Sequence, residues 1–160
     1  MDNIDLLHQT LLEGLAQVTG INHCSDYPRR RDQIKLPALL LDLVEIEPGK
    51  DPGTGELSVI THWEARLVTT DSQNESVTWN LTITVLLWLY NQSFPDKNIG
   101  MANIKQASPD NFSPDLQGHR VWLIEWTHKV RFGDNIWNGE GVIPGELWVS
   151  CNDEPYVQVA

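Results

Sequence analysis

The segment PALLLDLVEIEPGKDPGTGELSVITHWEARLV, residues 37–68, decides the fold. It begins with a run rich in Leu and Val, continues through a turn dense in Pro and Gly at 48–55, and ends with a run in which bulky residues occupy alternate positions. Alternation with a period of two is typical of a β-strand, and Pro and Gly are the strongest turn formers. The segment therefore predicts a long antiparallel β-hairpin with strands at Pro37–Glu47 and Glu56–Val68.

The two predicted strands differ in how their faces are composed. The first carries apolar side chains on both faces: Leu39, Leu41 and Leu43 on one, and Ala38, Leu40, Val44 and Ile46 on the other. Such a strand is typical of a sheet that is covered on both sides. In the second, apolar or bulky residues alternate with polar or mixed ones: Leu57, Val59, Thr61, Trp63, Ala65 and Leu67.

The elements around the hairpin follow from the same periodicities. A helix is predicted at Asn3–Thr19, with Asp2 or Asn3 as its N-cap and Gly20 at its end. It carries one apolar stripe, formed by Ile4, Leu7, Leu11, Leu15 and Val18. Four further strands are predicted: Ile21–Tyr27 at an edge, Met101–Ala107, His119–Phe132 and a short Glu146–Cys151. His119–Phe132 is expected to be half-buried, with its even-numbered residues from Trp122 to Phe132 facing the core. The tail after residue 151 is expected to be irregular.

Residues 71–94 fit two structures equally well. Their odd-numbered residues from Val77 to Leu89 alternate as in a strand, but the segment is far longer than an ordinary strand of about 5–6 residues. Ser72 and Glu75 have the spacing of a helix capping box. A helical stripe also exists at Val77, Leu81, Val85 and Trp88. The residues alone leave this choice open.

Composition excludes several classes of partner. The net charge is −11 and the pI about 4.7, whereas phosphate backbones and anionic membranes attract an excess of Lys and Arg. The first twelve residues do not resemble a signal peptide, and the apolar run at 85–90 is too short to span a bilayer. We expect a protein made in a cytoplasm, with Cys24 and Cys151 as free thiols and with neither nucleic acid nor membrane as a specific partner.

No motif predicts catalysis, a cofactor or a metal. The Gly-rich stretch 49–55 lacks the order of a phosphate-binding loop, and no serine nucleophile elbow is present. The histidines have no metal-ligand spacing: His8, His23, His62, His119 and His128. Acid pairs such as Asp42 with Glu45 or Glu47 arise by chance among 22 acidic residues, so solvated strand ends are the expected reading, with a small hydrolase as a distant alternative.

The features that remain suit contacts between proteins. Seven tryptophans are many for 160 residues, and Trp favours large buried contacts, in a core or at an interface. Arg29, Arg30 and Arg31 form the only basic cluster of an acidic chain, and Arg pairs well with carboxylates of a partner surface or of the protein itself.

Together the segments resemble a known family. The stretches LPALLLDL (36–43), EPGKDPGTGEL (47–57), LQGHRVWLIEW (116–126) and RFGDNIW (131–137) resemble, in this order, the tail proteins of Mu-like prophages. Those proteins are similar in layout to the tail terminators of long-tailed phages, including the lambda type. The resemblance covers about residues 3–137, and the turn at 51–57 and the strand at 121–126 are its most specific parts.

The resemblance implies a fold and a function. The fold is a single α+β domain over residues 1–160, with an antiparallel or mixed sheet, a long hairpin and two helices packed on it; the second helix is expected at Gln73–Gln92. The function is structural: subunits form a homo-oligomeric ring, usually a hexamer, that caps the tail tube, ends its polymerisation and offers a face to a head–tail completion protein. Assembly would take place in the bacterial cytoplasm, and the protein would end in the virion tail.

The expected interface residues lie in the basic cluster, the hairpin turn and the end of the matched region. They are Arg29, Arg30, Arg31, Lys50, Asp51, Thr54 and Trp137. Ring closure needs two different surfaces that meet, and reaching elements such as a long hairpin suit that role. Another minor tail protein or a head–tail joining protein is the alternative within the same class.

Overall fold

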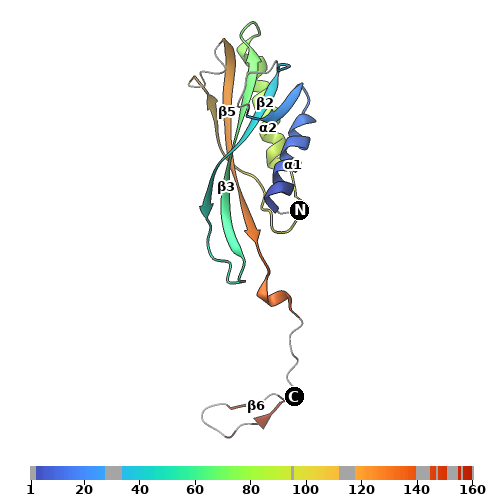
Figure 1. The fold of residues 1–160 in the computed structure, drawn as a ribbon, viewed down its shortest axis with the longest axis vertical. Helices are drawn as coiled ribbons and strands as arrows, with labels where there is room; N and C mark the ends of the chain where they lie inside the picture. Colours follow the sequence, from blue (N-terminus) through green and yellow to red (C-terminus); the bar gives the residue numbers. More distant parts are fainter. Residues whose placement is uncertain are drawn as a thin grey trace.

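The predicted hairpin forms the centre of a mixed β-sheet (Figure 1). The computed structural model describes residues 3–27, 34–94, 96–111 and 118–139, and, near the C-terminus, 145–146, 148–150, 155 and 157–159. Within these residues the main sheet has the strand order β1-β2-β3-β5-β4. The strands are β1 (His23–Asp26), β2 (Ala38–Pro48), β3 (Leu57–Thr70), β5 (His119–Phe132) and β4 (Asn103–Pro109). Strand β1 is parallel to β2, and all the other neighbouring strands are antiparallel.

Strand β3 pairs with β5 without interruption, from Leu57 opposite Phe132 to Thr70 opposite His119. The ladder between β2 and β3 is interrupted by a bulge at Val44, after which Glu45 lies opposite His62 and Ile46 opposite Thr61. One extra residue in a strand moves every later side chain to the other face. The prediction that Ile46 shares a face with Leu40 is therefore wrong, because the bulge places Ile46 on the same face as Leu39.

Two helices cover one face of this sheet, here called the inner face (Figure 1). Helix α1 (Asn3–Ala16) buries the predicted stripe, with Leu7, Leu11 and Leu15 fully inaccessible. It ends three residues earlier than predicted, and the chain turns at Gly20, whose φ of 93° favours glycine. The strand residues beneath the helices form the main core with them: Leu39, Leu41, Trp63, Ala65, Leu67, Ile124 and Trp126. The single-domain α+β fold and the inner face of β5 are confirmed.

Residues 75–91 are helical, as the family resemblance implied, but two details differ. The N-cap of α2 (Glu75–Asn91) is Asn74, whose side chain accepts a hydrogen bond from the amide of Ser76, so the predicted capping box is wrong. The buried face is also rotated from the predicted stripe and consists of Thr78, Thr82, Val85 and Leu89. Thr78 Oγ1 lies 2.9 Å from Oγ1 of Thr69 on β3, a hydrogen bond that holds this rotation.

The two helices approach each other closely at glycines. A Cβ atom on Gly14 would lie 2.0 Å from the Trp88 ring, and one on Gly20 would lie 2.5 Å from Leu81. Trp88 of α2 therefore rests directly on the backbone of α1. The contact fixes the spacing of the helix layer above the sheet.

The outer face of the sheet is covered only at one end. A second apolar cluster joins Leu40, Val68 and Val121 to Tyr27, Ile34 and Leu36. Only the first four residues of β2, 38–41, are buried without exception. The expected cover on both sides is therefore limited to this end, and from Asp42 onward the outer face of β2 is open.

A separate small sheet lies near the C-terminus, where β6 (Trp148–Val149) pairs with β7 (Val157–Gln158). The strand predicted at Glu146–Cys151 is shorter than expected, and β7 lies in the tail that was expected to be irregular. Between β5 and this sheet, Ile136–Asn138 form a short 3-10 helix, η2. Among the described residues, neither helix has the length and hydropathy that crossing a bilayer requires.

The contact between Gly14 and Trp88 makes a first prediction. Gly14→Ala should lower the free energy of unfolding by about 1–3 kcal/mol, because the added methyl would overlap the Trp88 ring and the ring would have to shift from its packed position. The gain in helix propensity, at most about 1 kcal/mol, acts in the opposite direction. Urea denaturation measures the difference. Gly139→Ala is the control, since nothing lies near its Cβ position; a Gly14→Ala variant at least as stable as the wild type would contradict the packing.

Candidate assembly interface

The tip of the hairpin is fixed to the segment that follows β5. The indole N–H of Trp137 donates to the carbonyl oxygen of Gly53 at 3.0 Å, and the amide of Ile136 donates to that of Thr54 at 2.9 Å. The turn itself is closed by Asp51, whose carboxylate accepts a hydrogen bond from the Gly53 amide. Gly53 has a φ of 69° there. These bonds hold the tip in one conformation.

A buried carboxylate strengthens the same connection. Glu56 is 7% exposed and accepts a hydrogen bond from the Thr54 hydroxyl at 2.7 Å, while Arg131 of β5 lies 3.8 Å away. A buried charge of this kind is tolerated only where it has such partners. The base of the turn is therefore tied to β5 by charge as well as by the ladder.

Four of the seven predicted interface residues come together at this tip. Lys50 and Asp51 are exposed, Thr54 is half-buried, and Trp137, from a distant part of the sequence, is 74% exposed. The three predicted arginines, Arg29, Arg30 and Arg31, lie outside the described residues.

The hairpin extends beyond the two helices (Figure 1): the fourteen residues of β3 span about 45 Å, whereas the helices span only about 20–25 Å. Leu57, the first residue of β3, and Ile46 of β2 are 62% and 56% exposed, although Val59 and Thr61 on the same inner face are buried. Ile46 lies beyond residues 38–41, where β2 pairs with β1, so β2 is there an edge strand of the described sheet. We call Ile46, Leu57, Ile136 and Trp137 the arm end.

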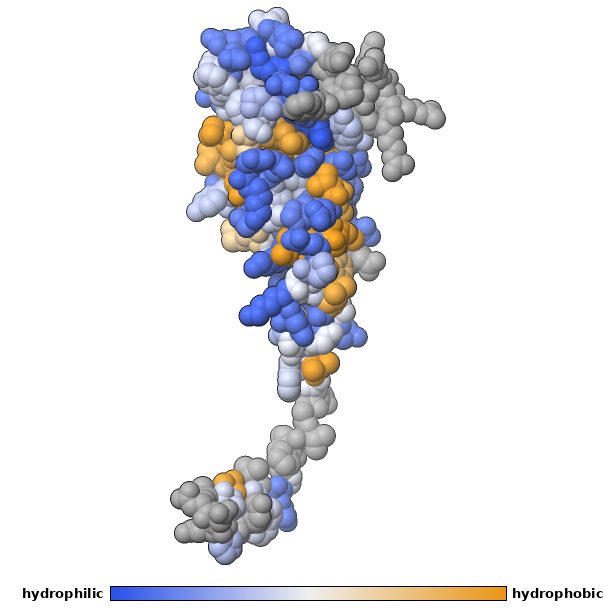
Figure 2. All heavy atoms as spheres, turned by 90° about the vertical axis from the view of Figure 1, so that its left-hand side faces the viewer, coloured by the Kyte–Doolittle hydropathy of each residue, from blue (hydrophilic) through white to orange (hydrophobic). Residues whose placement is uncertain are grey.

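A second apolar surface runs along the outward side of α2. Trp79, Ile83, Leu87 and Tyr90 follow one another at steps of four, four and three residues, and each is 49–67% exposed. We call these four residues the α2 stripe. No charged residue occurs from Ser76 to Asn91, whereas an ordinary surface helix carries charges on its outward side. Figure 2 likewise shows apolar surface on the body in separate areas, at the upper left and along the right-hand edge.

Reasoning from the sequence missed the α2 stripe, although its signal was present. Apolar residues at every second position, which favoured a strand, point in all directions when the chain is helical, since each step turns it by about 200°. A helix that is apolar all round must be covered on more than one side. The alternation from Val77 to Leu89 thus predicts, in a helix, apolar residues on the outward side as well as on the buried side.

The open part of the outer face has the opposite character. Asp42, Glu64 and Glu125 lie directly opposite one another across β2, β3 and β5. Glu125 accepts a hydrogen bond from Gln106 of β4, and Arg66 donates to Glu64 at 3.1 Å. Carboxylates placed in a row repel one another and keep this face hydrated. It is unsuited to an apolar partner.

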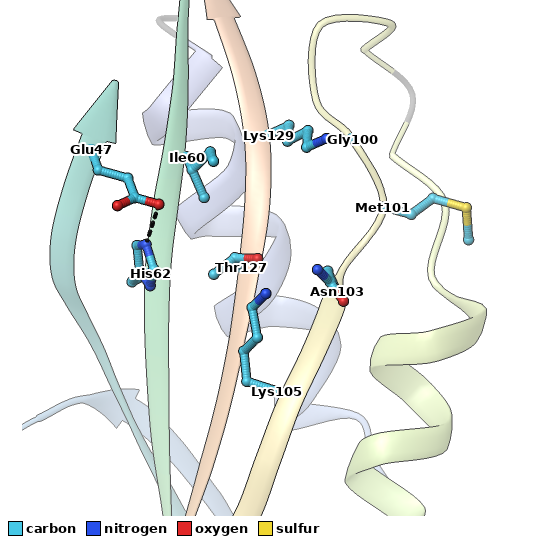
Figure 3. A pocket seen from close by; sticks show the side chains of 9 residues that line it. All are labelled: Glu47, Ile60, His62, Gly100, Met101, Asn103, Lys105, Thr127 and Lys129. Carbon is cyan, nitrogen blue, oxygen red and sulfur yellow. Dashed lines mark ion pairs between the residues drawn. The ribbon is translucent and has the colours of Figure 1, made fainter. Parts of the chain in front are cut away.

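Next to this row is a shallow hollow of about 390 Å³ (Figure 3). Glu47, His62, Thr127 and Asn103 lie side by side across its four strands. His62 Nε2 is 3.1 Å from a Glu47 oxygen, although the two are not oriented as a hydrogen bond. The acids of the hydrolase alternative, Asp42, Glu45 and Glu47, belong to this open, polar face.

The inner face contains one fully buried histidine, His128. Its Nε2 accepts a hydrogen bond from the Trp126 indole at 3.1 Å, and its Nδ1 lies 2.8 Å from the Gly100 carbonyl. Because Nε2 is an acceptor, the ring proton is on Nδ1 and the ring is neutral. Burial lowers the pKa of His128, and the hydrogen bond to Gly100 opposes this only in part. This is a satisfied core histidine and not a ligand.

Among the described residues, no group of three or more His, Cys, Asp or Glu side chains could hold a metal ion. Burial, and secondarily the charge of Asp26, raises the pKa of the Cys24 thiol to about 11, so this free thiol stays protonated and unreactive at neutral pH.

Comparison with known proteins gives no family. No family model matches the chain, and no curated protein is similar to it.

The hydrogen bond from Trp137 to the hairpin tip leads to a second prediction. Trp137→Phe keeps an aromatic ring but removes the N–H that Gly53 accepts, so the tip should open more often. Hydrogen exchange of the Ile136 amide, which is bonded to Thr54, should become several-fold faster, while the global unfolding midpoint changes little. Unchanged exchange at Ile136 would show that this bond does not hold the tip.

A third prediction concerns pH. An unfolded chain protonates histidine below about pH 6.5. Because the folded protein holds His128 neutral, the stabilisation is complete above that pH and is lost as the pH falls below it, by at most about 1.4 kcal/mol per pH unit. The free energy of unfolding, measured between neutral and mildly acidic pH, should fall more steeply for the wild type than for His128→Gln. Parallel curves would contradict a neutral buried ring.

Proposed function

We propose that this chain is the subunit of a phage or prophage tail terminator, a structural protein that forms a ring on the end of the tail tube. The observation that carries the proposal is the presence of two different exposed apolar surfaces on one domain, the arm end and the α2 stripe. A ring closes through heterologous contacts, in which one surface of a subunit meets a different surface of its neighbour. A chain with two such surfaces is suited to this kind of assembly.

The order of the elements gives further support. The resemblance to tail proteins of Mu-like prophages over residues 3–137 implied a helix, a long hairpin, a second helix and two more strands, and α1, β2–β3, α2, β4 and β5 follow that order. The proposal needs no chemical reaction. The ring would act through association free energy alone, and no cofactor is required.

The open outer face of the sheet suits the passage of DNA through the ring. A terminator leaves a channel through which DNA must pass without binding. The outer face carries the carboxylates of Asp42, Glu64 and Glu125 together with the cations Arg66, Lys105 and Lys129, so the support comes from the chain as a whole, whose net charge of −11 repels phosphates. We propose that this face lines the channel. The tube and the head–tail completion protein would then contact the two rims of the ring, with Arg29–Arg31 as candidates for pairing with acidic residues of either.

Deleting the gene from an inducible lysogen that carries it provides the test and the fourth prediction. Without a terminator the tube continues to polymerise, so electron microscopy of the lysate should show overlong tails without heads. Supplying the wild-type gene from a plasmid should restore particles of normal length. Particles of normal form and number in the deletion strain would refute the proposal.

Variants in the same complementation assay separate the alternatives. Asp42→Asn, Glu45→Gln and Glu47→Gln together should still restore infectious particles, whereas a hydrolase that used these acids would be inactive. Tails of normal length that fail to join heads would point instead to a head–tail joining protein.

A further inference from the structure

The arm end and the α2 stripe are complementary in character. We propose that the arm end of one copy of this chain packs on the α2 stripe of a neighbouring copy. The inference deepens the ring proposed above and rests on that ring being built from copies of this chain. It does not depend on the ring being attached to a tail.

The layer structure of the fold indicates what should cover the arm end. Along the body, the inner face of the sheet is covered by apolar sides of α1 and α2. Ile46 and Leu57 belong to the same face near the hairpin tip and are exposed there, whereas Thr61 and Val59 beside them are buried. A further helix with an exposed apolar stripe is the natural cover, because helices pack on sheets through such stripes. The α2 stripe of a second copy has this form.

The sizes of the two surfaces are matched. From the exposed fractions of their residues, each presents on the order of 400–500 Å² of apolar area. An interface is roughly 60% apolar, so each surface corresponds to about 800 Å² in total, which is one side of a standard protein interface. Each surface is of the size of the largest apolar patch on a typical monomer, about 300–600 Å², and this chain has two.

Charge favours the same pairing. Two molecules that each carry a net charge of −11 repel one another, so contact requires surfaces from which carboxylates are absent. The α2 stripe lies in a segment without charged residues from 76 to 91, and the four side chains of the arm end are all apolar.

The aromatic residues are placed as interface anchors. Trp79 and Tyr90 are on the α2 stripe and Trp137 is at the arm end, and Trp and Tyr are enriched among residues that dominate binding energy. The hydrogen bond from Trp137 to Gly53 fixes one edge of its ring while three quarters of the residue stays exposed. A side chain already held in place loses little conformational entropy on binding.

The test uses two variants of the full chain that lack one surface each. The arm variant is Ile46→Lys with Leu57→Lys, and the helix variant is Ile83→Lys with Leu87→Lys. All four side chains are more than half exposed, so both variants should fold, which circular dichroism and thermal melting check. The matched control is Gln9→Lys with Gln17→Lys, which adds the same charge at two exposed positions, one in α1 and one just after it.

Size-exclusion chromatography with light scattering, at the highest attainable concentration, gives the readout and the fifth prediction. The wild type and the control should form oligomers, and the arm variant and the helix variant should each be monomeric. Mixed in equal amounts, the two variants should form a heterodimer, because the intact stripe of one meets the intact arm end of the other. A surface that binds only a copy of itself would not be rescued by mixing.

The outcomes separate this contact from the proposed function. Variants that remain oligomeric, a mixture without heterodimer, or a wild type that stays monomeric would each overturn the contact, while the deletion experiment still decides the terminator. A wild type that is a closed dimer and obeys the mixing rule would support the contact and contradict the ring.

Discussion

The structure depends on a difference in length between its two layers. Strands β3 and β5 pair over fourteen residues, about 45 Å, whereas the helices that pack on their inner face are only about 20–25 Å long. The helices alone are too short for the whole face, and Phe94 and Ile99, from the segment after α2, cover part of the remainder at His128 and Val130. Leu57, at the end of β3, and Ile46, on β2, stay exposed, and the hydrogen bonds from Trp137 and Ile136 fix the hairpin tip to the segment after β5.

The same constraint explains why the two faces of the sheet differ so strongly. The inner face can tolerate polar groups only when they are paired, and His128, Trp126 and the Thr69–Thr78 pair all satisfy their hydrogen bonds there. Outside the small apolar cluster around Leu40, polar groups of the outer face can be hydrated and need no protein partner, so like charges can lie opposite one another. One face is therefore suited to association and the other to remaining hydrated.

The sequence was sufficient for most of the fold and for part of the site. Period-two alternation predicted β3 and β5 with their correct faces, and the stripe of α1 was correct, because one side of each element meets the core. The face of Ile46 was not predictable, since a bulge at Val44 leaves no mark in a pattern that is apolar on both faces. The cap at Asn74 and the rotation of α2 depend on tertiary contacts, Thr78 with Thr69 and Trp88 with Gly14, that no local pattern contains.

Helix α2 is apolar on two sides. Toward the core it packs Leu81, Leu86 and Trp88 together with the buried Val85 and Leu89, while its outward side carries Trp79, Ile83, Leu87 and Tyr90. An ordinary surface helix is polar on its outward side. In a monomer the outward residues of α2 leave their hydrophobic contribution unused in water. The proposed contact would use this contribution, because the arm end of another copy would supply a second apolar surface of similar size.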